Sequence, residues 1–140
     1  MSDVKTAPYG SWKSPITSDL IVKESIGLSQ VRLDGSDIYW IELRPSEGGR
    51  QVIVRRLPDG QTKDLTPSEM NARTRVHEYG GGEYSVHNGN VIFSNFSDQQ
   101  LYQQTGDGPP RILTTTAGRC VADGKRYADG IFDEKRKRLI

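Results

Sequence analysis

The sequence predicts an all-β fold in the form of a partial β-propeller, with about two and a half four-stranded blades. Three observations support this prediction. Short runs of strand-forming residues alternate with turns rich in Gly, Pro and Asp, no segment carries a helical stripe over three turns, and the strand pattern repeats along the chain. The 140 residues include 15 Gly and 7 Pro, which indicates many turns.

The first repeat unit is expected to contain four short strands. Two of the three connections between them contain residues that favour tight turns: Asp34–Asp37 forms a hairpin-type link, and Pro58–Gly60 turns the chain into the last strand. The expected strands are 28–33, 38–43, 51–57 and 61–65.

The second unit follows the same plan. Asn88-Gly89 is a hairpin turn between its first two strands, and the Gly- and Pro-rich segment 105–110 turns the chain into the fourth. The expected strands are 83–87, 90–96, 100–104 and 111–114.

The two units align with each other in sequence. Ile38-Tyr39-Trp40 aligns with Val91-Ile92-Phe93 at an offset of 53 residues, and Leu65-Thr66 aligns with Leu113-Thr114 at an offset of 48. Four-stranded units of this length are typical of β-propeller blades, whereas a β-sandwich with regularly spaced turns is the alternative. The repeated Leu-Thr ends and Asp-Gly turns favour the propeller.

A third copy begins at residues 127–132, with a turn at 133–137 and the start of a second strand at 138–140. Because propellers need four to eight blades to close, we expect the sequence to be cut short. The expected division is an N-terminal extended arm at 1–27, a first blade with its connector at 28–82, a second blade at 83–126 and the truncated start of a third at 127–140.

Two other segments carry weaker signals. Residues 6–15 contain too many helix and strand breakers for a regular element, so they predict an extended arm whose Tyr9 and Trp12 need a packing partner. Residues 67–73 are a weak helix candidate that Thr66 could cap, and we expect a single turn there.

Composition narrows the class of protein. The formal net charge of +1 gives no electrostatic reason to expect a nucleic acid or an anionic membrane as partner. The single Cys120 cannot form an internal disulfide and is expected to be a small buried thiol, which favours a reducing compartment. Without a signal-peptide pattern or a long apolar run, a cytoplasmic protein is expected.

The chain carries no complete catalytic machinery. It has no Gly-x-Ser-x-Gly nucleophile elbow and no phosphate-binding Gly-x-x-x-x-Gly-Lys loop. His77 and His87 have no Cys or carboxylate at ligand spacing, so we expect no metal and no cofactor.

The segment from Arg73 to Gly82 is the strongest candidate for a functional site. Three consecutive glycines permit positive φ and close backbone approach, and charged residues stand just before them. Glu78 could accept an ammonium group and Arg75 could bind a carboxylate, with His77 and Tyr79 as further substrate-facing residues. The alternative is a crossing between blades whose charges pair with each other.

Three segments carry a family resemblance that runs along essentially the whole chain. Residues 7–17 (APYGSWKSPIT), 75–82 (RVHEYGGG) and 93–102 (FSNFSDQQLY) resemble the N-terminal region of serine peptidases of the prolyl oligopeptidase family, in its dipeptidyl aminopeptidase/acylaminoacyl peptidase-like branch. Residues 126–130 are similar to the next blade opening of that branch.

The resemblance implies an N-terminal propeller that precedes a C-terminal α/β-hydrolase domain with a Ser-Asp-His triad. It implies that the propeller gates access to the active site and admits short peptides. No triad position falls in this chain. The alternative is a stand-alone β-repeat module that binds protein and oligomerises to complete a ring.

Overall fold

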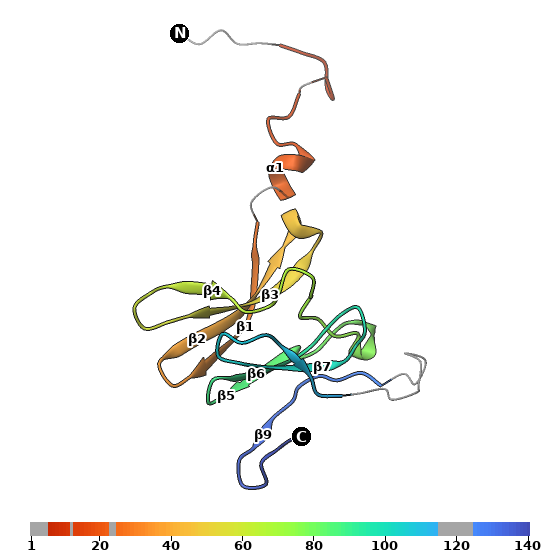
Figure 1. The fold of residues 1–140 in the computed structure, drawn as a ribbon. Coiled ribbons are helices and arrows are strands. Elements are labelled where there is room, and N and C mark those ends of the chain that lie inside the picture. The colour runs from red at the N-terminus through yellow and green to blue at the C-terminus, as the bar shows by residue number, and fades with distance from the viewer. Residues whose placement is uncertain (1–5, 12, 23–24, 115–124) are drawn as a thin grey trace.

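The computed structural model describes residues 6–11, 13–22, 25–114 and 125–140, so Trp12 and Cys120 lie outside the described residues. Within these ranges the chain forms two four-stranded antiparallel sheets and a two-stranded hairpin, which follow one another from the middle of Figure 1 to the bottom. The all-β prediction is confirmed.

The first sheet has the strand order β1-β2-β3-β4, and each strand pairs with the next one along the chain. Asp34 pairs with Asp37 across the predicted hairpin turn, where Gly35 has a φ of 61°. A short 3-10 helix, Pro45–Glu47, connects β2 to β3. The strands are β1 Gly27–Asp34, β2 Asp37–Arg44, β3 Arg50–Arg56 and β4 Thr62–Asp64.

The second sheet repeats this topology as β5-β6-β7-β8. Asn88 and Gly89 have φ values of 48° and 71°, as the tight hairpin turn predicted from the Asn-Gly pair requires. The strands are β5 Tyr84–His87, β6 Asn90–Ser94, β7 Leu101–Thr105 and β8 Arg111–Ile112. The eight strands predicted for the two units are therefore confirmed, although β4 and β8 are shorter than expected.

The repeated Leu-Thr pairs close both sheets in the same way. The Thr66 hydroxyl oxygen accepts a hydrogen bond from the Ile53 amide at 2.9 Å, and Thr114 does the same for Leu101 at 2.9 Å. The leucines that precede these threonines bond to the same strand residues: Leu65 donates its amide N–H to the Ile53 carbonyl oxygen, and Leu113 donates to that of Leu101, both at 2.8 Å. The Leu-Thr repeat thus supplies hydrogen-bond partners to backbone groups of the third strand, beyond the end of the short fourth strand.

The core lies between the two sheets. It brings together apolar side chains from β2, β3 and the connector between β4 and β5 (residues 65–83) with others from β5 and β6, and Val86 and Tyr102 pack around them. The buried members are Tyr39, Ile41, Ile53, Leu65, Met70, Ala72, Tyr84, Val91 and Phe93. Each sheet therefore buries its apolar face against its neighbour in sequence.

The first strands of successive units are linked at equivalent positions. Asp34, at the end of β1, accepts the amide N–H groups of Asn88 at 3.0 Å and Gly89 at 2.6 Å. His87, 53 residues after Asp34 and at the end of β5, has its Nε2 2.9 Å from a carboxylate oxygen of Glu134 in the third unit. Each unit's first strand thus holds the first turn of the next unit, as neighbouring propeller blades require.

The third unit begins with β9, Phe132–Asp133, which pairs with β10, Arg138–Leu139. The ring of His87 lies over the ring of Phe132, with centroids 5.1 Å apart, which fixes the hairpin beside β5. The predicted turn between these strands is present.

A short helix that the sequence did not predict lies in the N-terminal arm. This helix, α1, spans Ser18–Val22, and the Thr17 hydroxyl caps it by accepting the Leu20 amide N–H at 3.1 Å. Five residues are too few to show a periodic stripe. The arm leads away from the sheets in Figure 1, and the Tyr9 side chain is fully exposed. The weak helix candidate at 67–73 is a turn, closed by the Met70 amide bonding to the Pro67 carbonyl at 3.0 Å.

Candidate functional site

The connector between the two sheets is fastened to the β6–β7 loop before it reaches the predicted site. The Asn71 amide N–H donates to Asn95 Oδ1 at 3.1 Å, and the Phe96 amide N–H donates to the Asn71 carbonyl at 2.9 Å. Ala72 and Asn95 form an isolated antiparallel bridge. Together with the bond from the Arg75 amide to the Gln99 side chain at 2.8 Å, these contacts place segments 75–82 and 93–102 side by side, two of the three that carry the family resemblance.

Polar side chains hold the β6–β7 loop in a fixed conformation. Asp98 accepts the Gln100 amide N–H at 3.0 Å with one oxygen and the Tyr102 hydroxyl at 2.7 Å with the other, and this bond raises the pKa of Tyr102 to about 12. Gln99 is buried with a φ of 57°. Its side chain accepts the Arg75 amide N–H at 2.8 Å and donates to the Phe96 carbonyl at 2.9 Å.

Phe96 supports two arginine side chains from the connector. The guanidinium carbon of Arg75 lies 4.3 Å from the Phe96 ring centroid, and that of Arg73 lies 4.9 Å from it. Both arginines are exposed, and Phe96 is half-buried. These distances are within the range of cation–π attraction.

A strained turn follows Arg75. The 3-10 segment Val76–Glu78 contains His77 with a φ of 54° and Glu78 with a φ of 65°, both in the left-handed region. The turn is closed by the amide of Glu78 bonding to the Arg75 carbonyl and that of Gly80 to the Val76 carbonyl, both at 3.0 Å. Two consecutive non-glycine residues in this region store conformational strain, and such strain concentrates at functional sites.

The turn presents its side chains to solvent. His77 and Glu78 are exposed, and Tyr79 is 96% exposed. Glu78 Oε1 accepts a hydrogen bond from Arg126 Nη1 at 2.8 Å, and the same nitrogen donates to the Arg75 carbonyl at 2.9 Å. Because the Glu78 side chain is 79% exposed, this ion pair contributes little to stability. The Glu78 charge is therefore available to a ligand that can replace Arg126.

The three glycines after the turn serve packing within the chain. A Cβ atom on Gly81 would lie 2.8 Å from Ala128 Cβ, and one on Gly82 would lie 2.5 Å from Asp129 Oδ1. Gly82 and Asp129 also pair, since each donates its amide N–H to the other residue, at 3.0 and 2.8 Å. The close approach that the glycines permit is thus made by the third unit. The glycine run by itself gives no sign of a ligand.

Gln30 anchors the same connector from the first sheet. It sits at an irregularity in β1 with a φ of 52°. Its side-chain amide donates to the Gly81 carbonyl and accepts the Glu83 amide N–H, both at 3.2 Å, while its own carbonyl accepts the Tyr84 hydroxyl at 2.6 Å. The sequence carries no signal for this role, because the irregularity is visible only in the pairing register.

Glu83 is a buried carboxyl group next to the connector. Its side chain is largely inaccessible, its Oε2 atom has no hydrogen-bond partner among the described residues, and burial raises its pKa. A carboxyl group with a raised pKa holds its proton more readily, so its uncharged form limits the desolvation penalty.

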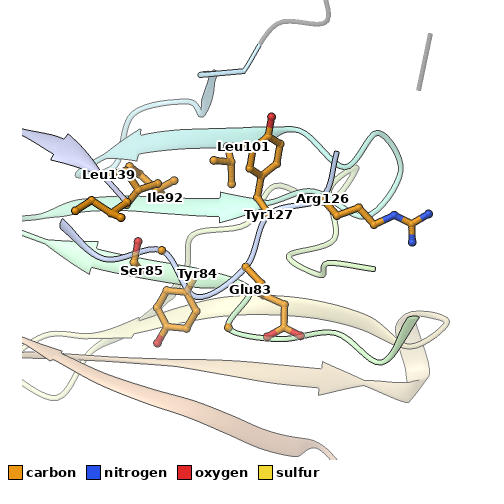
Figure 2. A pocket seen from close by; sticks show the side chains of 12 residues that line it. Glu83, Tyr84, Ser85, Ile92, Leu101, Arg126, Tyr127 and Leu139 are labelled. Atoms are coloured by element: carbon orange, nitrogen blue, oxygen red, sulfur yellow. The ribbon is translucent and has the colours of Figure 1, made fainter. Parts of the chain in front are cut away.

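A pocket of about 180 Å³ lies between the second sheet and the segment that enters the third unit (Figure 2). Ile92, Leu101 and Tyr127 contribute apolar walls, and the Arg126 side chain extends away from the pocket. None of the four predicted site residues lines it. Its volume is below the roughly 300 Å³ typical of small-molecule sites, which identifies it as a packing gap between units.

The structure brings the four predicted residues, Arg75, His77, Glu78 and Tyr79, together on one exposed turn. It adds Arg73 from the start of the predicted segment. It also adds Phe96 and Arg126, which sequence reasoning did not place at the site because their contacts with it span long distances along the chain. Over the ranges described, no group of three or more His, Cys, Asp or Glu side chains is arranged to hold a metal ion, and no helix is long and apolar enough to cross a membrane.

Solved structures similar to this chain are hydrolases. Puromycin hydrolase is 33% identical with a TM-score of 0.79, and the match covers 97% of this chain and 22% of that one. A serine-to-alanine mutant of puromycin hydrolase complexed with PGG is 35% identical with a TM-score of 0.81, over 97% of this chain and 22% of that one.

A puromycin-hydrolyzing peptidase of Mycobacterium tuberculosis is 37% identical with a TM-score of 0.80, over 96% of this chain and 21% of that one. No protein-family model and no curated protein matches the chain. The similarity to these solved structures confirms the resemblance to prolyl oligopeptidase family peptidases and the partial-propeller fold. The chain spans 22% of the length of puromycin hydrolase.

Proposed function

We propose that this chain is the N-terminal propeller segment of a serine peptidase that hydrolyses short peptides, and that the propeller gates access to a separate catalytic domain. One observation carries the proposal: the chain matches puromycin hydrolase over 97% of its own length at 33% identity, yet spans 22% of that protein. The rest of such a protein has room for a C-terminal α/β-hydrolase domain.

In that arrangement the chemistry belongs to the other domain. A serine, activated by a histidine base, attacks the peptide carbonyl, and an oxyanion hole stabilises the tetrahedral intermediate. The absence of a nucleophile elbow in these 140 residues agrees with this division of labour. We propose no cofactor.

The residues that we propose to face the substrate are Arg75, His77, Glu78 and Tyr79. The strain at His77 and Glu78 and the exposure of Tyr79 support this assignment. The Glu78 carboxylate is suited to an ammonium group, because Arg126 already occupies it in a cationic contact at 2.8 Å. The complex of puromycin hydrolase with PGG agrees with a short peptide as ligand.

The domain division proposed from the sequence is kept: an arm at 1–27, a first blade with connector at 28–82, a second blade at 83–126 and the start of a third at 127–140. We further propose a cytoplasmic location, for which the single Cys120 is the support, and no nucleic-acid or membrane partner, for which the net charge of +1 is the support.

The first test is to read the coding region beyond Ile140 in all three frames. The proposal predicts further blades and then a Gly-x-Ser-x-Gly elbow followed by Asp and His. Gating is tested separately, by assaying the complete enzyme on a short peptide and on the same sequence placed in a loop of a folded protein. Cleavage of the peptide alone supports gating, and equal cleavage of both contradicts it.

One observation favours a second candidate, the stand-alone binding module that oligomerises to complete a ring. The β1 side chains Leu28, Val31 and Leu33 are 68%, 63% and 72% exposed, and another copy of the chain could cover them. Light scattering coupled to size-exclusion chromatography decides between the two. A defined ring of 140-residue chains supports the module, whereas a coding region that continues into a hydrolase excludes it.

A further inference from the structure

The side chains of Arg73 and Arg75 form an exposed cationic feature of the candidate site. Both guanidinium groups lie over the ring of Phe96, at 4.9 and 4.3 Å from its centroid. A guanidinium group that contacts an aromatic ring through its face keeps its in-plane N–H donors free. Both side chains are exposed, so these donors are accessible to a ligand from solvent.

The support beneath these arginines is built before any ligand arrives. The Gln99 side chain joins the Arg75 amide to the Phe96 carbonyl, through bonds of 2.8 and 2.9 Å. Four residues before Arg75, the Asn71 amide N–H donates to Asn95 Oδ1 at 3.1 Å, which joins the connector to the same β6–β7 loop. Fixing the donors in advance lowers the entropy lost when a ligand binds.

The two positive charges have one acidic neighbour, the buried Glu83. Burial raises the pKa of its carboxyl group, and the nearby charge of Arg73 acts to lower it. In the part of the chain that the structure describes, no carboxylate lies within ion-pair distance of Arg73 or Arg75, and Glu78 is engaged by Arg126. Two like charges held against one ring repel each other, and a bound anion relieves that repulsion. The local charge pattern thus calls for an anionic ligand.

The kind of anion follows from the surroundings. Arginine presents a planar fork of donors that matches the two oxygens of a carboxylate. A polyanion such as a nucleic acid is disfavoured, because the exposed carboxylate of Glu78 follows Arg75 by three residues and the whole chain carries a net charge of only +1. A single carboxylate on an otherwise uncharged or cationic peptide fits both constraints.

We propose that Arg73 and Arg75, stacked on Phe96, form a subsite that binds a carboxylate group of the peptide substrate, so that peptides with a free carboxylate are the preferred substrate class. This assignment rests on the proposed function, because it presumes that the turn faces the substrate. The carboxylate comes either from an acidic side chain or from the peptide C-terminus.

The test uses the complete enzyme and four versions of one short peptide, with glutamate or glutamine at one position and a free or an amidated C-terminus. The variants are R73Q, R75Q and the double variant, with Arg56→Gln as the matched control, since Arg56 is an exposed arginine on β3. We expect the native enzyme to prefer a carboxylate form over its neutral match in kcat/KM. The double variant should lower that preference about tenfold, and R56Q should keep it.

The pair of peptides that differs identifies the source of the carboxylate. Equal kcat/KM for all four peptides in the native enzyme overturns the subsite. An equal loss for charged and neutral peptides in the double variant also overturns it, because the arginines then contact an acidic surface elsewhere in the protein. If none of the peptides is cleaved, the peptidase proposal fails, and calorimetric binding of the same four peptides still decides the subsite.

Two further variants protect the test against a folding defect. Arg75→Lys keeps the charge and removes the fork, so it should lose part of the preference. Phe96→Leu removes the ring and keeps both charges, so it should weaken the preference while thermal unfolding reports its stability. Full preference in both variants contradicts a stacked, forked carboxylate site.

Discussion

Arg126 Nη1 donates to Glu78 Oε1 at 2.8 Å, across 48 residues of sequence. The contact joins the segment that enters the third unit to the strained turn between the first and second units. Because the same nitrogen also donates to the Arg75 carbonyl at 2.9 Å, the position of the turn depends on both neighbouring units. The candidate site is therefore assembled from the connector between the first two units, the β6–β7 loop of the second unit and the segment that leads into the third.

Replacing Glu78 with Gln tests ammonium recognition directly. In the complete enzyme we expect kcat/KM to fall about tenfold for peptides with a free amino terminus and to stay unchanged for the same peptides with an acetylated one. Glu69→Gln is the control, since Glu69 is exposed on the turn at 67–70. Equal kinetics for Glu78→Gln and the native enzyme on both peptide forms remove Glu78 from substrate recognition.

Substitution of Gly82 by Ala tests the packing of the connector. The added Cβ would lie 2.5 Å from Asp129 Oδ1 and 3.2 Å from Asp129 Cα, so the Asp129 side chain must leave the Gly82 amide and the Asp129 backbone must move slightly. We expect a loss of about 1–3 kcal/mol in the free energy of unfolding, measured by urea denaturation. Gly27→Ala is the matched control, because its Cβ would meet Leu43 at 3.4 Å, an ordinary contact. Equal stability of the two variants contradicts the steric explanation.

Replacing Gln30 with Leu removes the anchor of the connector on β1. The Gly81 carbonyl and the Glu83 amide lose their partners, so we expect a loss of about 1–3 kcal/mol in the free energy of unfolding. The exposed Gln61, changed to Leu, serves as the control. A loss no larger than that of Gln61→Leu shows that water replaces both hydrogen bonds at no penalty.

The pKa of Tyr102 leads to a prediction about alkaline stability. The hydrogen bond to Asp98 raises this pKa to about 12, above the ordinary value of 10.0. The folded state therefore keeps a proton that the unfolded state releases, and stability present below pH 10 is lost as the pH rises toward 12.

Unfolding measured from pH 9 to 12 should show a smaller loss of stability for Tyr102→Phe than for the native chain. Some loss remains in the variant, because burial also raises the pKa values of Tyr39 and Tyr84. Carbon NMR of the tyrosine ring gives the pKa of Tyr102 independently. Asp98→Asn should bring that pKa back toward its ordinary value. Titration of native Tyr102 at its ordinary value contradicts the prediction.

The strands and turns could be predicted because their signals are local. The Asn88-Gly89 pair needs positive φ at both residues, and the sequence shows this directly. Helix α1 escaped prediction because a five-residue helix has no visible period.

The sequence pointed to the charged segment before three glycines, and the structure gathers its four predicted residues on one exposed turn. The positive φ and the close backbone approach expected of the glycines are both present, but the partner that approaches is the third unit of the same chain. Gly81 and Gly82 make room for Ala128 and Asp129, a contact over 47 residues that no local pattern encodes. Whether the turn binds substrate stays a prediction. The contact of Arg73 with the Phe96 ring also escaped prediction, because the two residues lie far apart in the sequence and meet only when two separate loops pair.

The link from Asp34 to the turn at Asn88 and Gly89 has a consequence for synthesis of the chain. While only the first sheet has left the ribosome, Asp34 has no turn to hold, and the core residues Tyr39 and Ile41 have no second sheet to cover them. The first sheet reaches its final packing only after the second has emerged. Folding must therefore advance from the N-terminus with a delay of one repeat, and a pause in translation between the two sheets would expose the nascent chain to aggregation.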